Sequence, residues 1–122
     1  MREIKFRGKR EDTKEWVYGD LIHYNEQFVI NVYETEVGYY AYQVPIIPKT
    51  VGQFTGLPSQ DKEDIYEGDR LFDYDDDYYV VEFSEGRFVA VGDGFEVDLF
   101  EIADRCSIIG NIHDNQKLLE VK

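Results

Sequence analysis

The sequence predicts a mainly β protein with a minor helical part, in which short antiparallel strands form a small, partly open barrel or sandwich with a short C-terminal helix. Three observations favour this class. Aromatic residues make up 16% of the 122 residues and gather with β-branched residues in short runs. Turns containing glycine or proline separate these runs. No apolar pattern of helical period reaches about twelve residues.

The first half of the chain predicts two antiparallel strand pairs. Residues 3–7 and 15–22 carry apolar side chains at alternating positions on either side of a polar turn, which indicates one hairpin. Runs of β-branched and aromatic residues at 28–35 and 39–44 flank Gly38 and indicate a second.

Two prolines give the clearest interruption of the pattern of predicted strands. Pro45 and Pro48 end regular pairing, because proline has no amide hydrogen to donate to a ladder. Residues 51–57 are glycine-rich, and residues 58–63 have the composition of an exposed turn. We expect a single domain over residues 1–122, and the alternative is two subregions meeting near residues 45–50.

The second half predicts a meander of short strands. Glu85-Gly86 and Gly92-Asp93-Gly94 suit tight hairpin turns, because glycine accepts positive φ. A short helix follows near the C-terminus over residues 115–121, capped by Asp114 or Asn115. The expected strands are residues 70–74, 78–84, 87–91, 95–100 and 107–112.

The charge is strongly acidic and unevenly distributed. The net charge is −13, and residues 62–122 hold 17 acidic against 6 basic side chains. Such a field repels phosphate, so direct nucleic-acid binding is not expected. The exception is an N-terminal basic strip, for which the simpler interpretation is an edge strand protected by charge. Its members are Arg2, Lys5, Arg7, Lys9 and Arg10.

The cysteine content and the apolar runs predict a cytoplasmic protein. Cys106 is the single cysteine, so no internal disulfide can form, and we expect it to be a small core residue. The N-terminal residues lack the apolar core of a signal peptide, and no apolar run approaches the length of a membrane span.

Three carboxylates are weak candidates for a metal site. Asp73, Asp75 and Asp77 would share one face of an extended segment, and hard cations prefer such oxygen ligands. The calcium-loop pattern fails, because Tyr78 replaces its glycine and Ser84 its final glutamate. The simpler interpretation is a solvated hairpin tip.

No motif assigns a catalytic or cofactor-binding residue. His23 and His113 could each act as a base, but nothing in their spacing brings a nucleophile to either. Gly92-Asp93-Gly94 resembles the opening of a dinucleotide fingerprint without its last glycine, and a turn is the expected structure.

Tyrosines are abundant enough to suggest a recognition surface. Tyrosine brings large apolar area with few rotatable bonds and is favoured at interfaces. The alternative is that alternate rings cover the two faces of a sheet. The candidate partner surface comprises Tyr39, Tyr40, Tyr42, Tyr74, Tyr78 and Tyr79.

Several stretches in sequence order resemble the YopX family of phage and prophage proteins. They are MREIKFR at 1–7, WVYGDL at 16–21, VGQFTGL at 51–57, DKEDIYEGD at 61–69 and IGNIHDN at 109–115. The resemblance implies a phage or prophage gene expressed in the bacterial cytoplasm, and it transfers no catalytic or binding residue. In the middle block we expect a fold-defining turn, with Asp69 binding local amides before the strand at Arg70; a binding loop is the alternative.

The leading hypothesis is therefore a phage accessory protein that binds an unknown host or phage protein without catalysis, and that could form a homo-oligomer. One alternative is an acidic decoy of nucleic acid that occupies a DNA-binding protein. The other is a metal-dependent hydrolase or nuclease using Asp73, Asp75 and Asp77.

Overall fold

The computed structural model describes residues 3–34 and 40–114, without the side chains of Glu34, Tyr40 and Ala41. The chain divides into two compact units, here called unit 1 (residues 1–54) and unit 2 (residues 55–122). In both units the described residues form antiparallel strands with only short helical segments, which confirms the predicted mainly β class. The division falls between Phe54 and Thr55, a few residues beyond the region 45–50.

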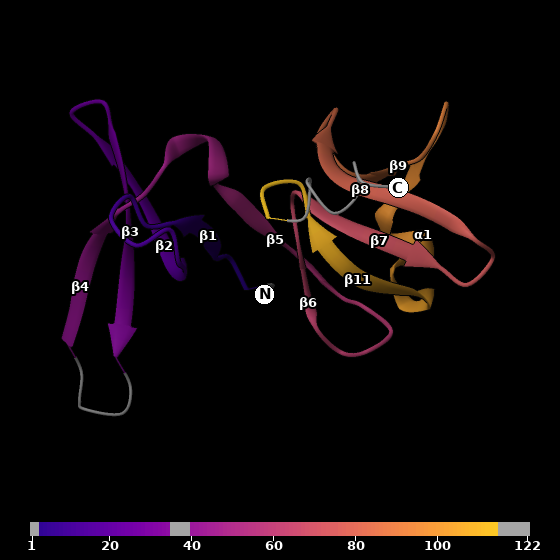
Figure 1. Cartoon of the computed structure of the whole chain (residues 1–122), viewed down its shortest axis with the longest axis horizontal. Coiled ribbons are helices and arrows are strands. Elements are labelled where there is room, and N and C mark those ends of the chain that lie inside the picture. The colour runs from indigo at the N-terminus through magenta and orange to yellow at the C-terminus, as the bar shows by residue number, and fades with distance from the viewer. Residues whose placement is uncertain (1–2, 35–39, 115–122) are drawn as a thin grey trace. The chain divides into compact units, whose positions relative to one another are not determined.

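Unit 1 is an antiparallel sheet in the order β4-β3-β2-β1-β5 (Figure 1). Both predicted hairpins are confirmed, although the first strand begins at Phe6 and not at Glu3. Residues 51–57, predicted only as glycine-rich, contribute a strand whose first residues pair with β1. The elements are β1 (Phe6–Lys9), β2 (Trp16–Tyr24), β3 (Gln27–Glu34), β4 (Tyr40–Pro45), the 3-10 helix η1 (Pro48–Thr50) and β5 (Gly52–Pro58).

The core of unit 1 depends on close approach between strands. β2 and β3 join through Asn25 and Glu26, both at positive φ, as a two-residue hairpin turn requires. A side chain at Gly19 would meet the Asn31 carbonyl oxygen at 2.1 Å, so only glycine lets β2 approach β3 here. The buried apolar side chains are Val29, Ile30, Val44, Ile46 and Phe54.

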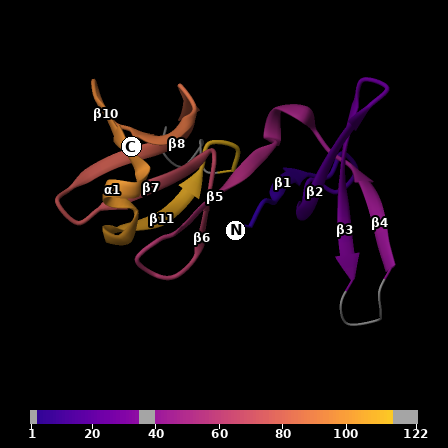
Figure 2. The same cartoon turned by 180° about the vertical axis from the view of Figure 1, so that it is seen from behind.

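Unit 2 contains a five-stranded antiparallel sheet in the order β10-β9-β8-β7-β11. The predicted meander is confirmed with small changes at strand ends, and β9 has the predicted bounds. The short helix α1 contacts β9 and β10. Figure 2 shows α1 among the strands of this unit from behind. The elements are β6 (Asp64–Tyr66), β7 (Asp69–Asp73), β8 (Asp77–Ser84), β9 (Arg87–Val91), β10 (Glu96–Asp98), α1 (Leu99–Ile102), the 3-10 helix η2 (Ala103–Arg105) and β11 (Cys106–Asn111).

The turns of unit 2 have the predicted chemistry. Glu85 and Gly86 both adopt positive φ between β8 and β9. The Gly92 N–H donates to the Phe95 carbonyl at 2.8 Å, which closes a turn in place of a dinucleotide loop. Residues 58–63 form the expected loop, except that Ser59 is buried and accepts from the N–H of Asp61.

The prediction of a strand through residues 95–100 is wrong after Asp98. The Asp98 carboxylate accepts from the Phe100 N–H at 3.0 Å and caps α1. Leu99 and Ile102, three residues apart, bury one face of this turn in the core. The Asp98 cap and the burial of these two side chains thus favour a helical turn over continuation of the strand. The helix predicted over residues 115–121 lies outside the described residues.

The turn before β7 is stabilised by Asp69. Ile65 and Tyr66 are buried, Gly68 adopts a φ of 94°, and Asp69 is 2% exposed. The Asp69 carboxylate accepts from the Tyr66 N–H at 2.7 Å, which confirms the predicted bond to a local amide. Beside it, the Thr55 hydroxyl donates to the Ile65 carbonyl at 2.8 Å and ties β5 to β6. These contacts give the middle block a structural role.

The core of unit 2 lies between one face of the sheet and the elements α1, η2 and β6. Its buried members are Ile65, Leu71, Tyr79, Val81, Phe88, Ala90, Leu99, Ile102, Ala103 and Cys106. Because side chains alternate along a strand, the opposite face of β7, β8 and β9 carries a separate set of residues. That outer face of the sheet contains the candidate site.

Candidate functional site

The candidate tyrosines that the structure describes differ in exposure and in the unit that carries them. Tyr74 and Tyr78 are 64% and 57% exposed on the β7–β8 hairpin, and Tyr42 is exposed on β4 in unit 1. Tyr79 is only 5% exposed and belongs to the core, so its ring is not available to a partner. Tyr39 lies outside the described residues, as does the side chain of Tyr40. Two exposed tyrosines of the set therefore remain together.

The three candidate carboxylates lie at a hairpin turn and not along an extended segment. Asp73 ends β7 and pairs with Asp77 at the start of β8. Between them the chain turns through Asp76 at a φ of 71°, and the Asp76 N–H donates to the Asp73 carbonyl at 2.8 Å. Asp75 and Asp77 are exposed, whereas Asp73 is 2% exposed.

Asp73 is engaged within the fold. Its carboxylate accepts from the Asp75 N–H at 3.1 Å and from the Arg105 Nε at 3.0 Å. The Asp75 amide first, and the Arg105 guanidinium second, hold the pKa of the Asp73 carboxyl below its usual value against the effect of burial. Among residues 3–34 and 40–114 no three His, Cys, Asp or Glu side chains are grouped so that they could hold a metal ion.

The histidines and the cysteine make separate contacts within their own units. The exposed His23 stacks on Phe28 in unit 1 with ring centroids 4.2 Å apart. His113 follows β11 in unit 2, where its N–H donates to the Asn111 side chain at 2.8 Å. Cys106 is fully buried, which confirms it as a core residue, and burial raises the pKa of its thiol to about 11. A thiol in this state is a poor nucleophile at neutral pH.

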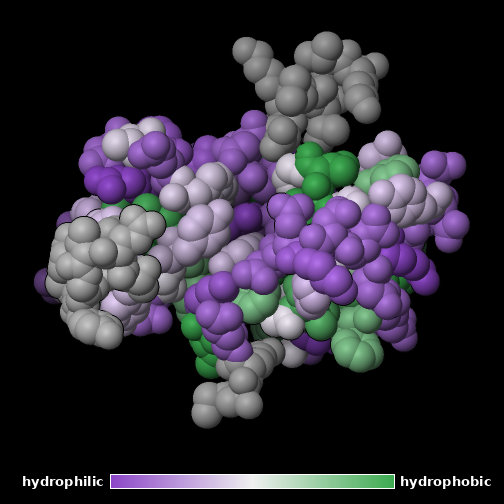
Figure 3. All heavy atoms as spheres, turned by 90° about the horizontal axis from the view of Figure 1, so that it is seen from below, coloured by the Kyte–Doolittle hydropathy of each residue, from purple (hydrophilic) through white to green (hydrophobic). Residues whose placement is uncertain are grey.

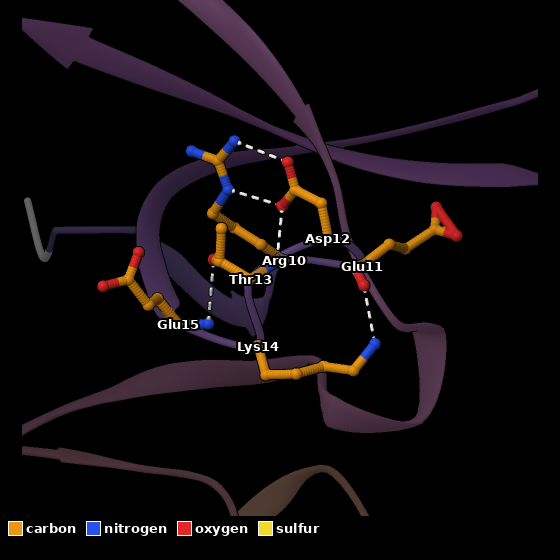
Figure 4. A network of polar contacts seen from close by, with 6 residues as sticks. All are labelled: Arg10, Glu11, Asp12, Thr13, Lys14 and Glu15. Carbon is orange, nitrogen blue, oxygen red and sulfur yellow. Dashed lines mark hydrogen bonds and ion pairs between the residues drawn. The ribbon is translucent and has the colours of Figure 1, made fainter.

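The basic strip makes contacts within unit 1. Arg10 binds the Asp12 carboxylate with two nitrogens at 2.9 and 3.0 Å in the turn drawn in Figure 4. This hydrogen bond is the main reason that the pKa of Asp12 falls to about 2. The Arg7 guanidinium lies 4.6 Å from the centre of the Trp16 ring, and Lys5 lies 4.9 Å from that of Phe54. Arg2 lies outside the described residues.

The outer face of the sheet in unit 2 carries a groove of about 310 Å³. On the face drawn in Figure 3 hydrophilic residues dominate and hydrophobic ones form small separate patches. Tyr78 is 57% and Ile109 43% exposed, while Val80 and Val91 are half-buried. The groove is lined by Arg70, Leu71, Tyr78, Tyr79, Val80, Val91 and Ile109.

Strand register brings these residues together. Arg70 on β7 faces Val80 on β8, and Val80 faces Val91 on β9. On the other side β11 bends, because its register shifts between Ile108 and Gly110, where Ile109 stands. The row Arg70, Val80, Val91 is therefore continuous across three strands.

Sequence reasoning missed this groove, although a signal was present. The runs YYVV at 78–81 and FVAV at 88–91 do not alternate strictly between apolar and polar residues. Such runs are typical of strands with apolar side chains on both faces. Only the paired strands show which member of each run lies on the outer face.

A second groove, of about 500 Å³, lies between the loop 58–62 and α1. It includes Phe100, which is 75% exposed, but charged residues such as Lys62, Glu101 and Asp104 also line it. A larger share of its lining is therefore polar than in the sheet groove.

What the sheet groove can do chemically is bind. Its described lining offers apolar side chains, the Arg70 guanidinium and the Tyr78 hydroxyl, without a pair of residues arranged as nucleophile and base. No described helix is long and apolar enough to cross a lipid bilayer.

Comparison with known proteins identifies the family of the chain. No curated protein matches the sequence. The family model described as YopX protein matches residues 5–120, which include nearly all of both units, the β7–β8 hairpin and the groove. The resemblance seen in the sequence motifs is thereby confirmed, and the chain belongs to the YopX family.

Proposed function

We propose that this chain is a protein-binding module without catalytic activity, encoded by a phage or prophage and acting in the bacterial cytoplasm. The observation that carries the proposal is the mainly apolar groove on the outer sheet face of unit 2, with Tyr78 and Ile109 exposed at it. Partly exposed apolar area of this kind favours association, because a partner removes it from water. Tyrosine is also common among residues that dominate binding energy.

The contacts of the other candidate groups agree with this proposal. Asp73 binds Arg105 and the hairpin backbone, and Cys106 is buried with a raised pKa. The hydrolase alternative needs Asp75 and Asp77 to bind a cation with Asp73, and no described contact favours that arrangement over the turn.

Affinity capture with matched variants tests the groove. Tagged wild-type chain, Ile109→Glu and Phe100→Glu are each expressed in prophage-carrying cells, and the retained proteins are identified by mass spectrometry. Both substitutions place a carboxylate at an exposed apolar position, one at each groove. We expect a protein retained by wild type and Phe100→Glu to be lost from Ile109→Glu, and the purified pair to bind directly.

Two results would contradict the proposal. Equal retention by all three chains would remove the sheet groove from the interface. Loss from Phe100→Glu alone would move the interface to the second groove.

The acidic decoy is the second candidate, favoured by the 17 acidic residues among 62–122. A decoy binds mainly through charge, so its affinity falls steeply between about 50 and 500 mM salt, whereas binding in an apolar groove changes little. Measuring the purified complex across this range separates the two functions.

A further inference from the structure

Arg70 is the feature of the groove that its apolar character does not explain. It stands opposite Val80 on β8 and Gly110 on β11, in the row that continues from Val80 to Val91, so no polar side chain lies directly opposite it. Its Nε is buried and has no hydrogen-bond partner among the described residues. A buried guanidinium N–H without an acceptor is unfavourable, and native structures rarely retain one without a reason.

The lack of an acceptor is notable in this chain. The sequence holds 26 acidic residues, and Arg10, Arg87 and Arg105 each form an ion pair with one of them. In the described part of the molecule Arg70 makes no salt bridge. Arg70 is also the charged residue of the groove lining, whose other members are aliphatic or aromatic. The sheet thus holds, beside an apolar surface, a guanidinium whose buried Nε has no acceptor among the described residues.

We infer that the groove recognises a protein segment in which a large apolar side chain stands next to a carboxylate, and that Arg70 binds this carboxylate. The inference rests on the proposed function and names the chemistry of its partner. Arginine donates two parallel hydrogen bonds to a carboxylate, which fixes orientation as well as supplying affinity. Val80, Val91 and Ile109 contact the apolar side chain.

Charge and size favour this ligand over larger anions. A net charge of −13 disfavours the approach of nucleic acid or other polyanions, whereas a single carboxylate meets Arg70 at a much smaller penalty. A groove of about 310 Å³ is at the lower limit for small-molecule sites and matches one or two side chains. The segment therefore inserts one side chain and pairs one charge.

Two small probes of equal size test the role of Arg70. N-acetyl-phenylalanine carries an aromatic ring and a carboxylate, and N-acetyl-phenylalaninamide replaces the charge by an amide. Each is titrated into the full ¹⁵N-labelled chain while backbone amide shifts are followed by NMR. A probe of about 15 non-hydrogen atoms should bind in the millimolar range. We expect the carboxylate probe to shift amides of β7, β8, β9 and β11, and the amide probe to bind about tenfold more weakly.

Variants test whether Arg70 causes the preference for the carboxylate probe over the amide probe. Arg70→Gln should weaken the carboxylate probe about tenfold and leave the amide probe unchanged. Arg87→Gln is the matched control, because it removes a cation of the same sheet that is paired with Glu96 at 3.6 Å, and it should preserve the preference. Ile109→Glu should weaken both probes.

The outcomes separate this inference from the proposed function. Equal affinity for the two probes, or a preference that survives Arg70→Gln, overturns the carboxylate role of Arg70 while leaving an apolar binding groove. Failure of both probes to bind overturns the inference, and the capture experiment then decides the proposed function on its own. If sedimentation shows a wild-type dimer that Ile109→Glu dissociates, the groove is occupied by a second copy and the inference is wrong.

Discussion

Replacing Asp73 by alanine should destabilise unit 2 by about 2 kcal/mol, more than any other substitution in the aspartate run. The carboxylate is 2% exposed and accepts two hydrogen bonds, from the Asp75 N–H and from Arg105 Nε. A hydrogen bond to a charged group contributes about 1.5–3 kcal/mol net. Asp75 is exposed and the Arg105 side chain is 56% exposed, so both donors regain water in the variant. The expected loss of about 2 kcal/mol is therefore below the roughly 3–6 kcal/mol that two such bonds would contribute together.

The pH dependence of the free energy of unfolding is a second test of the role of Asp73. The pKa of Asp73 is lowered in the folded chain, so the carboxylate stabilises the fold above its unfolded pKa of about 3.9. That contribution is lost as the pH falls through the lower, folded pKa. The difference between wild type and Asp73→Ala should accordingly be full at pH 7 and shrink below about pH 4.

Urea unfolding followed by circular dichroism measures both effects. Asp75→Ala is the matched control, because it removes only an exposed carboxylate and keeps the backbone N–H that donates to the Asp73 carboxylate. The stability of this variant should stay within about 0.5 kcal/mol of wild type. Equal losses for the two variants would refute the reasoning. So would a midpoint that rises with millimolar Mg²⁺ in wild type and not in Asp75→Ala, because the run would then bind a cation.

Three further substitutions or reactions test the fold. Gly19→Ala should lower the free energy of unfolding by about 3 kcal/mol, because the new methyl group meets the Asn31 backbone oxygen. Gly8→Ala should lower it less, because its methyl group meets the flexible end of the Ile46 side chain at 2.6 Å. Equal thermal stabilities of the two variants would contradict this expectation. Asp69→Ala should cost about 1–3 kcal/mol in urea by removing the acceptor for the Tyr66 N–H, whereas the exposed Asp93→Ala changes little. Cys106, with a pKa of about 11 and no exposed surface, should react with iodoacetamide at pH 8 far more slowly than in 6 M urea; labelling at the same rate in both would show that the thiol is accessible.

Where local chemistry fixes the conformation, sequence reasoning predicted it well. Glu85-Gly86 and Gly92-Asp93-Gly94 form the expected turns, and the Asp69 carboxylate binds a local amide as predicted. These features depend on a few neighbouring residues and on the φ values that glycine or a short side chain allows. The family motifs are similarly visible in the sequence alone.

Where two conformations suit the same residues, the sequence was insufficient. Residues 95–100 have the composition of a strand, yet the Asp98 cap and the burial of Leu99 and Ile102 make α1. The aspartates at 73, 75 and 77 would share one face only if extended, and the turn at Asp76 places Asp73 inside and the other two in solvent.

The sequence by itself determined that this is a β-rich chain of short hairpins, an acidic one, and one with a buried cysteine. Only the tertiary structure decided which of the adjacent Tyr78 and Tyr79 faces solvent, and that Arg70, Val80 and Val91 form one row. The physical reason is that successive strand residues point to opposite faces, so a shift of one residue in register exchanges the two sets. Register is set by pairing between strands far apart in the sequence, and the groove exists only once those pairs have formed.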